Sequence, residues 1–222
     1  MFQPICRLML LILLLFAGAL IGLRAALFHA PPANDEAGRF VLSDCAMPCW
    51  QGIQPGVTRI DDAILLLNSN PWVKGLQIVE RPPSTYLYWD WSAVKPRFAG
   101  DPHALIPPEM WGQNGVIQLI FIPTSLAYGE VSLLLGAPNR GLFAVSSTPN
   151  PLTLATHPNT QHLAVYFGGS VSFGTRLVCP VNLDLFWNAP VSIAYIDDAL
   201  VRSQSIFDYD LAHWLYSQPC NA

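Results

Sequence analysis

The stretch Thr58-Arg-Ile-Asp-Asp-Ala-Ile-Leu-Leu-Leu-Asn68 decides the fold class, because it predicts an amphipathic helix with defined ends. Its apolar residues share the i, i+3, i+4, i+7 spacing of a single helix face: Ile60, Ala63, Ile64 and Leu67. Thr58 is a residue type that caps helix N-termini, Asn68 can adopt the left-handed conformation after the last turn, and Pro71 prevents continuation. We therefore predict a helix over residues 58–68 with one buried stripe.

A second stretch, Ser125-Leu-Ala-Tyr-Gly-Glu-Val-Ser-Leu-Leu-Leu-Gly136, has the same design further along the chain. Ser125 can cap it, Gly136 can end it, and its apolar stripe contains Tyr128, Val131 and Leu135. Both helices carry a Leu-Leu-Leu run in the same place, which predicts an internal structural repeat. Two capped, leucine-rich helices can also resemble each other by chance, and this alternative stays open.

Strand-like runs follow each helix. They cover residues 76–80, 86–92 and 115–122 after the first helix, and residues 142–146, 162–167, 171–179 and 191–196 after the second. Clusters of Gly, Pro and Asn separate these runs, as antiparallel meanders require. We therefore predict an α+β fold of two small repeats, residues 45–123 and 124–222. Each repeat is expected to be a helical element packed on a short antiparallel sheet.

The N-terminal region predicts a membrane segment. Residues 8–28 are apolar except for Arg24, and a membrane-spanning helix needs about 20 such residues. A cleaved signal segment is the alternative, because Ala17-Gly-Ala19 fits a small-x-small cleavage site. We expect an uncleaved transmembrane anchor or signal segment over residues 1–30 and a spacer over residues 31–44. The bulk of the chain should then be extracytoplasmic, at the cell surface or in the periplasm.

Four cysteines follow the expected membrane segment: Cys45, Cys49, Cys179 and Cys220. An oxidising compartment favours disulfides, so we predict at least one among these four residues. Four cysteines allow three pairings, and the sequence leaves the choice open. The segment from Cys45 to Cys49 also resembles half of a zinc site, but no second pair of ligands follows at zinc-binding spacing.

Two windows carry a family resemblance. PGVTRIDDAILLL (residues 55–67) and TSLAYGEVSLLLGAPN (residues 124–139) resemble the helix-turn signature of the SmpA/OmlA (BamE) outer-membrane assembly lipoproteins and of the β-lactamase-inhibitor-protein fold. PCWQGIQPG (residues 48–56) is similar to a segment of uncharacterised membrane-anchored bacterial proteins. The resemblance implies tandem α+β units and a protein-binding role. It transfers no partner, because no assembly or inhibitory-loop residue maps onto this chain.

Composition and motifs disfavour several classes of protein. Charged residues make up 12% of the chain, with a net charge of −4 and no Lys/Arg run, so nucleic-acid binding lacks electrostatic support. None of the five histidines has HExxH or HxH spacing, and Gly168-Gly-Ser-Val-Ser172 lacks the last glycine of a nucleophile elbow. We therefore expect a non-enzymatic protein with no catalytic residue, no cofactor and no bound metal.

The aromatic segment Tyr86-Leu-Tyr88-Trp89-Asp-Trp91 is the densest functional signal. In a strand, Tyr86 and Tyr88 face one way while Leu87 and Trp89 face the other. The two tyrosines, with Trp111 on the following loop, form a candidate partner surface, since Tyr and Trp are favoured interface anchors. In the alternative interpretation, residues 93–114 form a loop that covers the tyrosines.

These patterns predict an exported, membrane-anchored, non-enzymatic protein-interaction or structural module of the cell envelope. Residues 8–28 would contact the membrane, and an envelope protein would be the partner. One alternative is an exported hydrolase or carbohydrate-active protein that uses Asp/Glu residues and the aromatic sheet face. A glycosidase would need two carboxylates roughly 5–10 Å apart. The other alternative is an envelope sensor of a small molecule or lipid.

Overall fold

The computed structural model describes residues 16, 18, 35–42, 45–101, 104, 106–146, 159–178, 181–197 and 207–208. The chain divides into two units, Met1–Asp35 and Glu36–Ala222. Apart from residues 16 and 18, the expected membrane segment lies outside the described residues. Among the helices within those ranges, none is both long and apolar enough to cross a membrane.

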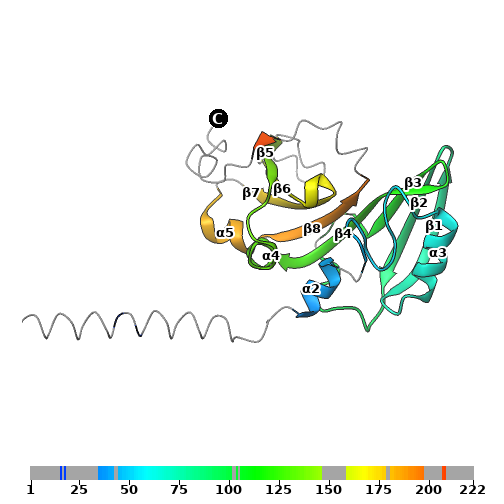
Figure 1. Cartoon of the computed structure of the whole chain (residues 1–222), viewed down its shortest axis with the longest axis horizontal. Coiled ribbons are helices and arrows are strands. Elements are labelled where there is room, and N and C mark those ends of the chain that lie inside the picture. Colours follow the sequence, from blue (N-terminus) through cyan, green and yellow to red (C-terminus); the bar gives the residue numbers. More distant parts are fainter. Residues whose placement is uncertain are drawn as a thin grey trace, which may run out of the picture. The chain divides into compact units, whose positions relative to one another are not determined.

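The second unit is built on one antiparallel sheet, which confirms the α+β class (Figure 1). Its long strands are β1 (Val73–Arg81), β2 (Ser84–Trp91), β3 (Glu109–Gln113), β4 (Val116–Ala127), β5 (Arg140–Ser146), β6 (Asn159–Tyr166), β7 (Val171–Val178) and β8 (Pro190–Ile196). A two-residue strand, β9 (Phe207–Asp208), pairs with β5 at one edge. The strand order is β1-β2-β3-β4-β8-β7-β6-β5-β9.

The expectation of two separate short sheets is wrong, because β4 pairs with β8 in the middle of the sheet (Figure 1). Leu119 lies opposite Ile196 and Phe121 lies opposite Ala194. Each expected strand run is present, and β3 is an additional strand within residues 93–114, which were expected to form a loop. The two meanders therefore share one hydrogen-bonded sheet.

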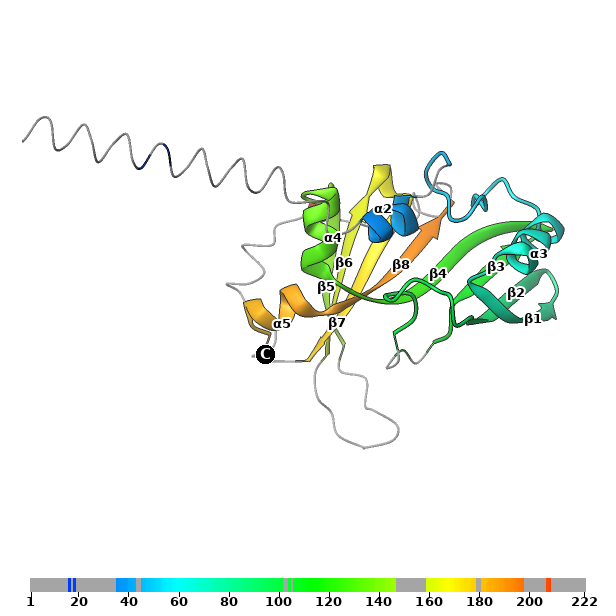
Figure 2. The same ribbon diagram turned by 90° about the horizontal axis from the view of Figure 1, so that it is seen from below.

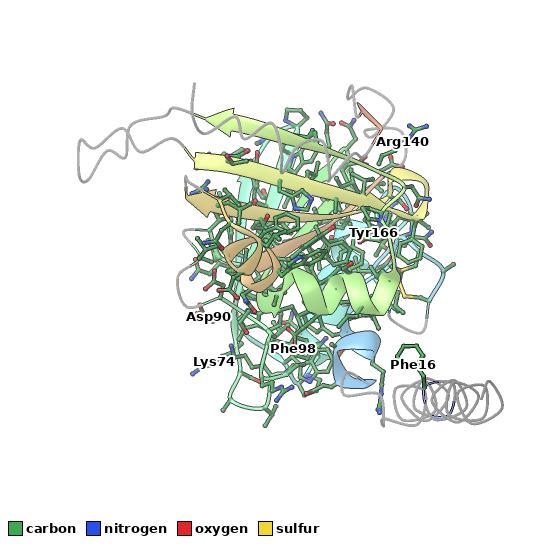
Figure 3. All side chains as sticks on the ribbon, turned by 90° about the vertical axis from the view of Figure 1, so that its left-hand side faces the viewer. Phe16, Lys74, Asp90, Phe98, Arg140 and Tyr166 are labelled. Atoms are coloured by element: carbon green, nitrogen blue, oxygen red, sulfur yellow. A yellow bond between two sulfur atoms is a disulfide. The ribbon has the colours of Figure 1, made fainter. Side chains whose placement is uncertain are left out.

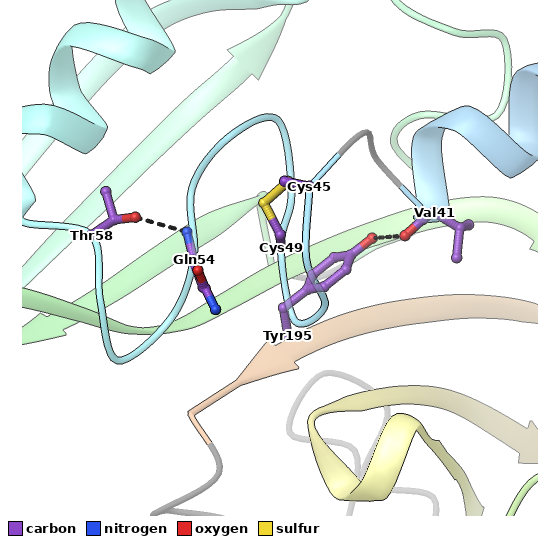
Figure 4. Close-up of a disulfide and its surroundings, with 6 residues drawn as sticks. All are labelled: Val41, Cys45, Cys49, Gln54, Thr58 and Tyr195. Carbon is purple, nitrogen blue, oxygen red and sulfur yellow. Dashed lines mark hydrogen bonds between the residues drawn. A yellow bond between two sulfur atoms is a disulfide. The ribbon is translucent and has the colours of Figure 1, made fainter.

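The two expected helices are α3 (Ile60–Ser69) and α4 (Tyr128–Leu135), and both begin later than predicted. The Oγ1 of Thr58 accepts a hydrogen bond from the Gln54 backbone N–H at 2.8 Å, so Thr58 closes the preceding turn and does not cap α3 (Figure 4). Ser125 remains within β4, where neighbouring Thr124 donates to the Val191 carbonyl of β8 at 2.7 Å. A local turn at Thr58 and the extension of β4 through Ser125 thus replace the expected caps.

The four α-helices α2 to α5 contact the same face of the sheet, here called the inner face. Seen from below in Figure 2, α2 (Asp35–Leu42) and α4 lie in front of the strands. Tyr195 of β8 reaches α2, and Ile60 of α3 packs against Gly112 of β3. His162 of β6 meets rings of α4 and of α5 (Leu183–Asn188). One continuous buried core therefore lies between the helices and this face.

Helix α2 lies in the range expected to be a spacer. Its Phe40 and Val41 are fully buried, and the Tyr195 hydroxyl donates to the Val41 carbonyl at 2.9 Å (Figure 4). A disulfide joins Cys45 to Cys49 immediately after this helix, so one of the expected disulfides is present. Cys179 and Cys220 lie outside the described residues. The folded domain therefore begins before residue 45, where the first repeat was expected to start.

Candidate partner-binding surface

Strand β2 separates its side chains onto the two faces of the sheet. Leu87 and Trp89 are 0% and 2% exposed on the inner face. Tyr86 and Tyr88 are half-buried on the opposite face, here called the outer face, and Asp90 beyond them is exposed. The alternation expected from the sequence is therefore present in the strand.

Strand β3 brings two further side chains to the tyrosines. Trp111 lies directly opposite Tyr86, and Glu109 lies directly opposite Tyr88. The rings of Tyr86 and Tyr88 are almost parallel, with 6.2 Å between their centroids. The sequence predicted that Trp111 would lie near the tyrosines on a loop, and the structure places it on a paired strand.

The neighbouring strands extend this surface into a larger patch. On β4, Leu119 is opposite Trp111 and Phe121 is opposite Glu109; on β1, Val79 and Gln77 are opposite the two tyrosines. We call these eight residues the aromatic patch: Gln77, Val79, Tyr86, Tyr88, Glu109, Trp111, Leu119 and Phe121. Gln77 is exposed and the other seven are half-buried, so the patch is a broad surface of mainly apolar side chains.

The loop before β3 does not cover the tyrosines with the residues that the structure describes. Phe98 and Ala99 are buried in the inner core, and the Phe98 ring lies 5.1 Å from that of Phe40 on α2 (Figure 3). This part of the loop therefore packs with the helices, on the other side of the sheet. Residues 102, 103 and 105 are outside the described ranges.

The polar groups of the patch have distinct electrostatic surroundings. Burial raises the pKa of the Glu109 carboxyl, and a hydrogen bond donated by the Tyr88 hydroxyl lowers it in part. Burial and then the Glu109 charge raise the pKa of the Tyr88 hydroxyl. The guanidinium carbon of Arg81 lies 6.0 Å from the centre of the Tyr86 ring, within the range of a cation–π contact.

Trp111 contributes a hydrogen-bond donor that nothing in the structure uses. Its indole Nε1 is buried and has no acceptor in the part of the chain that the structure describes. This nitrogen is shielded from solvent, so it is also out of reach of an acceptor on another molecule. The aromatic patch therefore offers apolar area and one carboxylate.

Other side chains that could take part in catalysis or metal binding have structural roles. The Oγ of Ser170 donates to the Phe167 carbonyl at 2.7 Å, which makes this serine part of a turn. Asp61 and Asp62 lie in the first turn of α3, where the helix dipole favours acidic residues. Within the ranges given above, no three His, Cys, Asp or Glu side chains gather as a metal site would require.

The sequence alone identified three of the eight residues of the patch and missed five: Gln77, Val79, Glu109, Leu119 and Phe121. Phe121 could have been found, because residues 115–122 were expected to be a strand and alternation puts Phe121 on one face. Glu109 could not have been found, because its position beside Tyr88 depends on β3.

Comparison with protein-family models, with curated proteins and with solved structures finds no match.

Proposed function

We propose that the chain is an exported, membrane-anchored, non-enzymatic interaction module of the cell envelope, in which the aromatic patch binds an envelope protein. The observation that carries this proposal is the asymmetry of the sheet. Helices α2 to α5 pack on the inner face, while a tryptophan, two tyrosines and a phenylalanine gather on the outer face. Contiguous apolar surface of this kind marks interaction sites, and Tyr and Trp are favoured anchors.

Two features support an extracytoplasmic location. The apolar run of residues 8–28 is long enough to anchor the chain, and it ends shortly before α2. The Cys45–Cys49 disulfide suits an oxidising compartment. An anchor at this position would hold the folded domain close to the membrane and restrict its partners to the envelope.

The strand order also supports the tandem arrangement implied by the family resemblance. The sheet runs β1 to β4 and then β8 back to β5, so the last strands of the two meanders meet. A helix precedes each meander, α3 in residues 45–123 and α4 in residues 124–222. Superposition of the two halves tests the repeat, which requires α3 and α4 to coincide when the strands are matched.

Site-specific photo-crosslinking of the full chain in its own membranes tests the proposed function. A photoreactive residue at Gln77, at the exposed margin of the aromatic patch, should join the chain to one defined protein. The same residue at exposed Asn68 on α3 is the matched control and should give no such product. The tyrosine pair Tyr86→Ala with Tyr88→Ala should abolish the product.

The crosslinking experiment has outcomes that would contradict the proposal. Identical products from Gln77 and Asn68 would show that the aromatic patch is not selective. An adduct with a glycan or a lipid would favour the carbohydrate-active protein or the envelope sensor instead. Affinity purification of the tagged partner should in turn recover this chain, which excludes a chance encounter during illumination.

A further inference from the structure

Glu109 is the one charged residue among the eight residues of the aromatic patch. Tyr88 on β2 and Phe121 on β4 lie directly opposite it on either side, and Trp111 follows two residues later on the same face. Its carboxylate therefore has aromatic neighbours, and no cation within the described ranges contributes to the shift of its pKa. A half-buried carboxylate in such surroundings has lost hydration, which only an opposite charge or hydrogen-bond donors can replace.

Resting on the proposed function, we infer that the aromatic patch receives an arginine side chain of the partner protein. Glu109 is the counter-ion of the guanidinium group, and the rings of Tyr86, Tyr88 and Trp111 contact its planar face. Arginine fits better than lysine, because its planar group binds a carboxylate through two parallel hydrogen bonds and stacks on aromatic rings.

One observation besides the charge supports an arginine. Arg81 of the chain itself already places its guanidinium group over the Tyr86 ring, so these rings accept such a cation on their surface. An exposed arginine supplies both a positive charge for Glu109 and a planar group for the rings. A metal ion lacks the planar group, and an apolar ligand lacks the charge.

The test uses two short capped peptides, Gly-Arg-Gly and Gly-citrulline-Gly, and the full chain in detergent micelles. Citrulline has nearly the shape of arginine but no charge. With the tryptophans labelled with ¹⁵N, the arginine peptide should shift the Trp111 indole resonance in a saturable way. The citrulline peptide should require at least a tenfold higher concentration. Equal responses to the two peptides would overturn the inference.

Two variants locate the charge that is responsible. Glu109→Gln keeps an acceptor for the Tyr88 hydroxyl and should weaken binding of the arginine peptide about tenfold. Asp90→Asn removes an exposed carboxylate from the neighbouring strand β2, where Asp90 lies opposite Lys74 of β1 (Figure 3), and should leave binding unchanged. Loss of binding in Asp90→Asn, or unchanged binding in Glu109→Gln, would contradict the assignment.

Photo-crosslinking from Gln77 then separates this inference from the proposed function. If the partner is captured by the unaltered chain and by Glu109→Gln, but not by the tyrosine double variant, the surface is correct and the arginine is wrong. If Glu109→Gln also loses the partner, the arginine is supported. If the unaltered chain captures no protein, the proposed function fails whatever the peptides do.

Discussion

At the scale of single residues, His162 shows a titratable group used for packing. It is 1% exposed, and its ring lies 4.7 Å from that of Tyr128 and 5.0 Å from that of Phe186. Its Nδ1 is 3.3 Å from the Thr175 Oγ1 on the next strand. Burial lowers the pKa of His162 to about 3, so the side chain is neutral in the folded protein at ordinary pH.

This burial predicts a loss of stability in acid. The unfolded chain takes up a proton at His162 as the pH falls below about 6.5, and the folded chain does so only near 3. The free energy of unfolding should therefore fall between these values, by up to about 1.4 kcal/mol per pH unit from this group. Urea titrations from pH 7 to pH 4 should show that the free energy of unfolding falls less steeply in the double variant His162→Phe, Thr175→Val than in the unaltered chain. An equally steep fall in both proteins would contradict this prediction.

The residues of the aromatic patch differ in how far the sequence predicts them. Tyr86 and Tyr88 could be assigned to one face because a strand has a strict period of two. Their neighbour Glu109 could not be assigned, since cross-strand neighbours depend on a register that the sequence does not state. The half-buried carboxylate, on which the arginine inference depends, is therefore visible only in the structure.

At the scale of elements, the sequence predicts type better than boundaries. Apolar periodicity found α3 and α4, but Thr58 and Ser125 are engaged in a turn and a strand, so both helices begin later. Strand β3 was missed because it has only five residues, follows two prolines and contains Gly112. That glycine allows close packing, because a Cβ there would lie 2.7 Å from the Ile60 Cδ1 of α3 and 3.1 Å from the Val116 carbonyl oxygen.

Helix α3 supplies a matched pair of substitutions. Leu67 is 1% exposed, so Leu67→Ala should lower the free energy of unfolding by about 2–5 kcal/mol. Leu65 on the same helix is 68% exposed, and Leu65→Ala should change it by less than about 0.5 kcal/mol. Chemical unfolding of the two variants measures both values. Similar losses for the two would mean that α3 does not bury the face described.

The disulfide after α2 should make a modest contribution, because Cys45 and Cys49 are separated by only four positions. The chain-entropy model gives about 2 kcal/mol for so short a loop. Cys45→Ala with Cys49→Ala should lose about that much, and adding reductant to the unaltered chain should have the same effect. A large further effect of reductant on the double variant would show that this disulfide does not account for the redox dependence.

At the scale of the whole molecule, one sheet organises the domain. Pairing of β4 with β8 joins two meanders, and the helices cover one side of them. The sequence predicted the class, the strands and the two helices. It did not predict the single sheet, because a pairing between distant strands leaves no local pattern. Because the two meanders share one sheet, their helices can cover the same face, and the aromatic patch lies on the face opposite α2 to α5.

The central claim is that a partner covers the aromatic patch in the envelope, and hydroxyl-radical footprinting of the full chain tests it most directly. Tyr86, Tyr88 and Trp111 should be oxidised several-fold less in native membranes than in purified protein. Trp187 on α5, which is 36% exposed, should react equally in both and serves as the control. Equal oxidation of the three patch residues in both preparations would contradict the account.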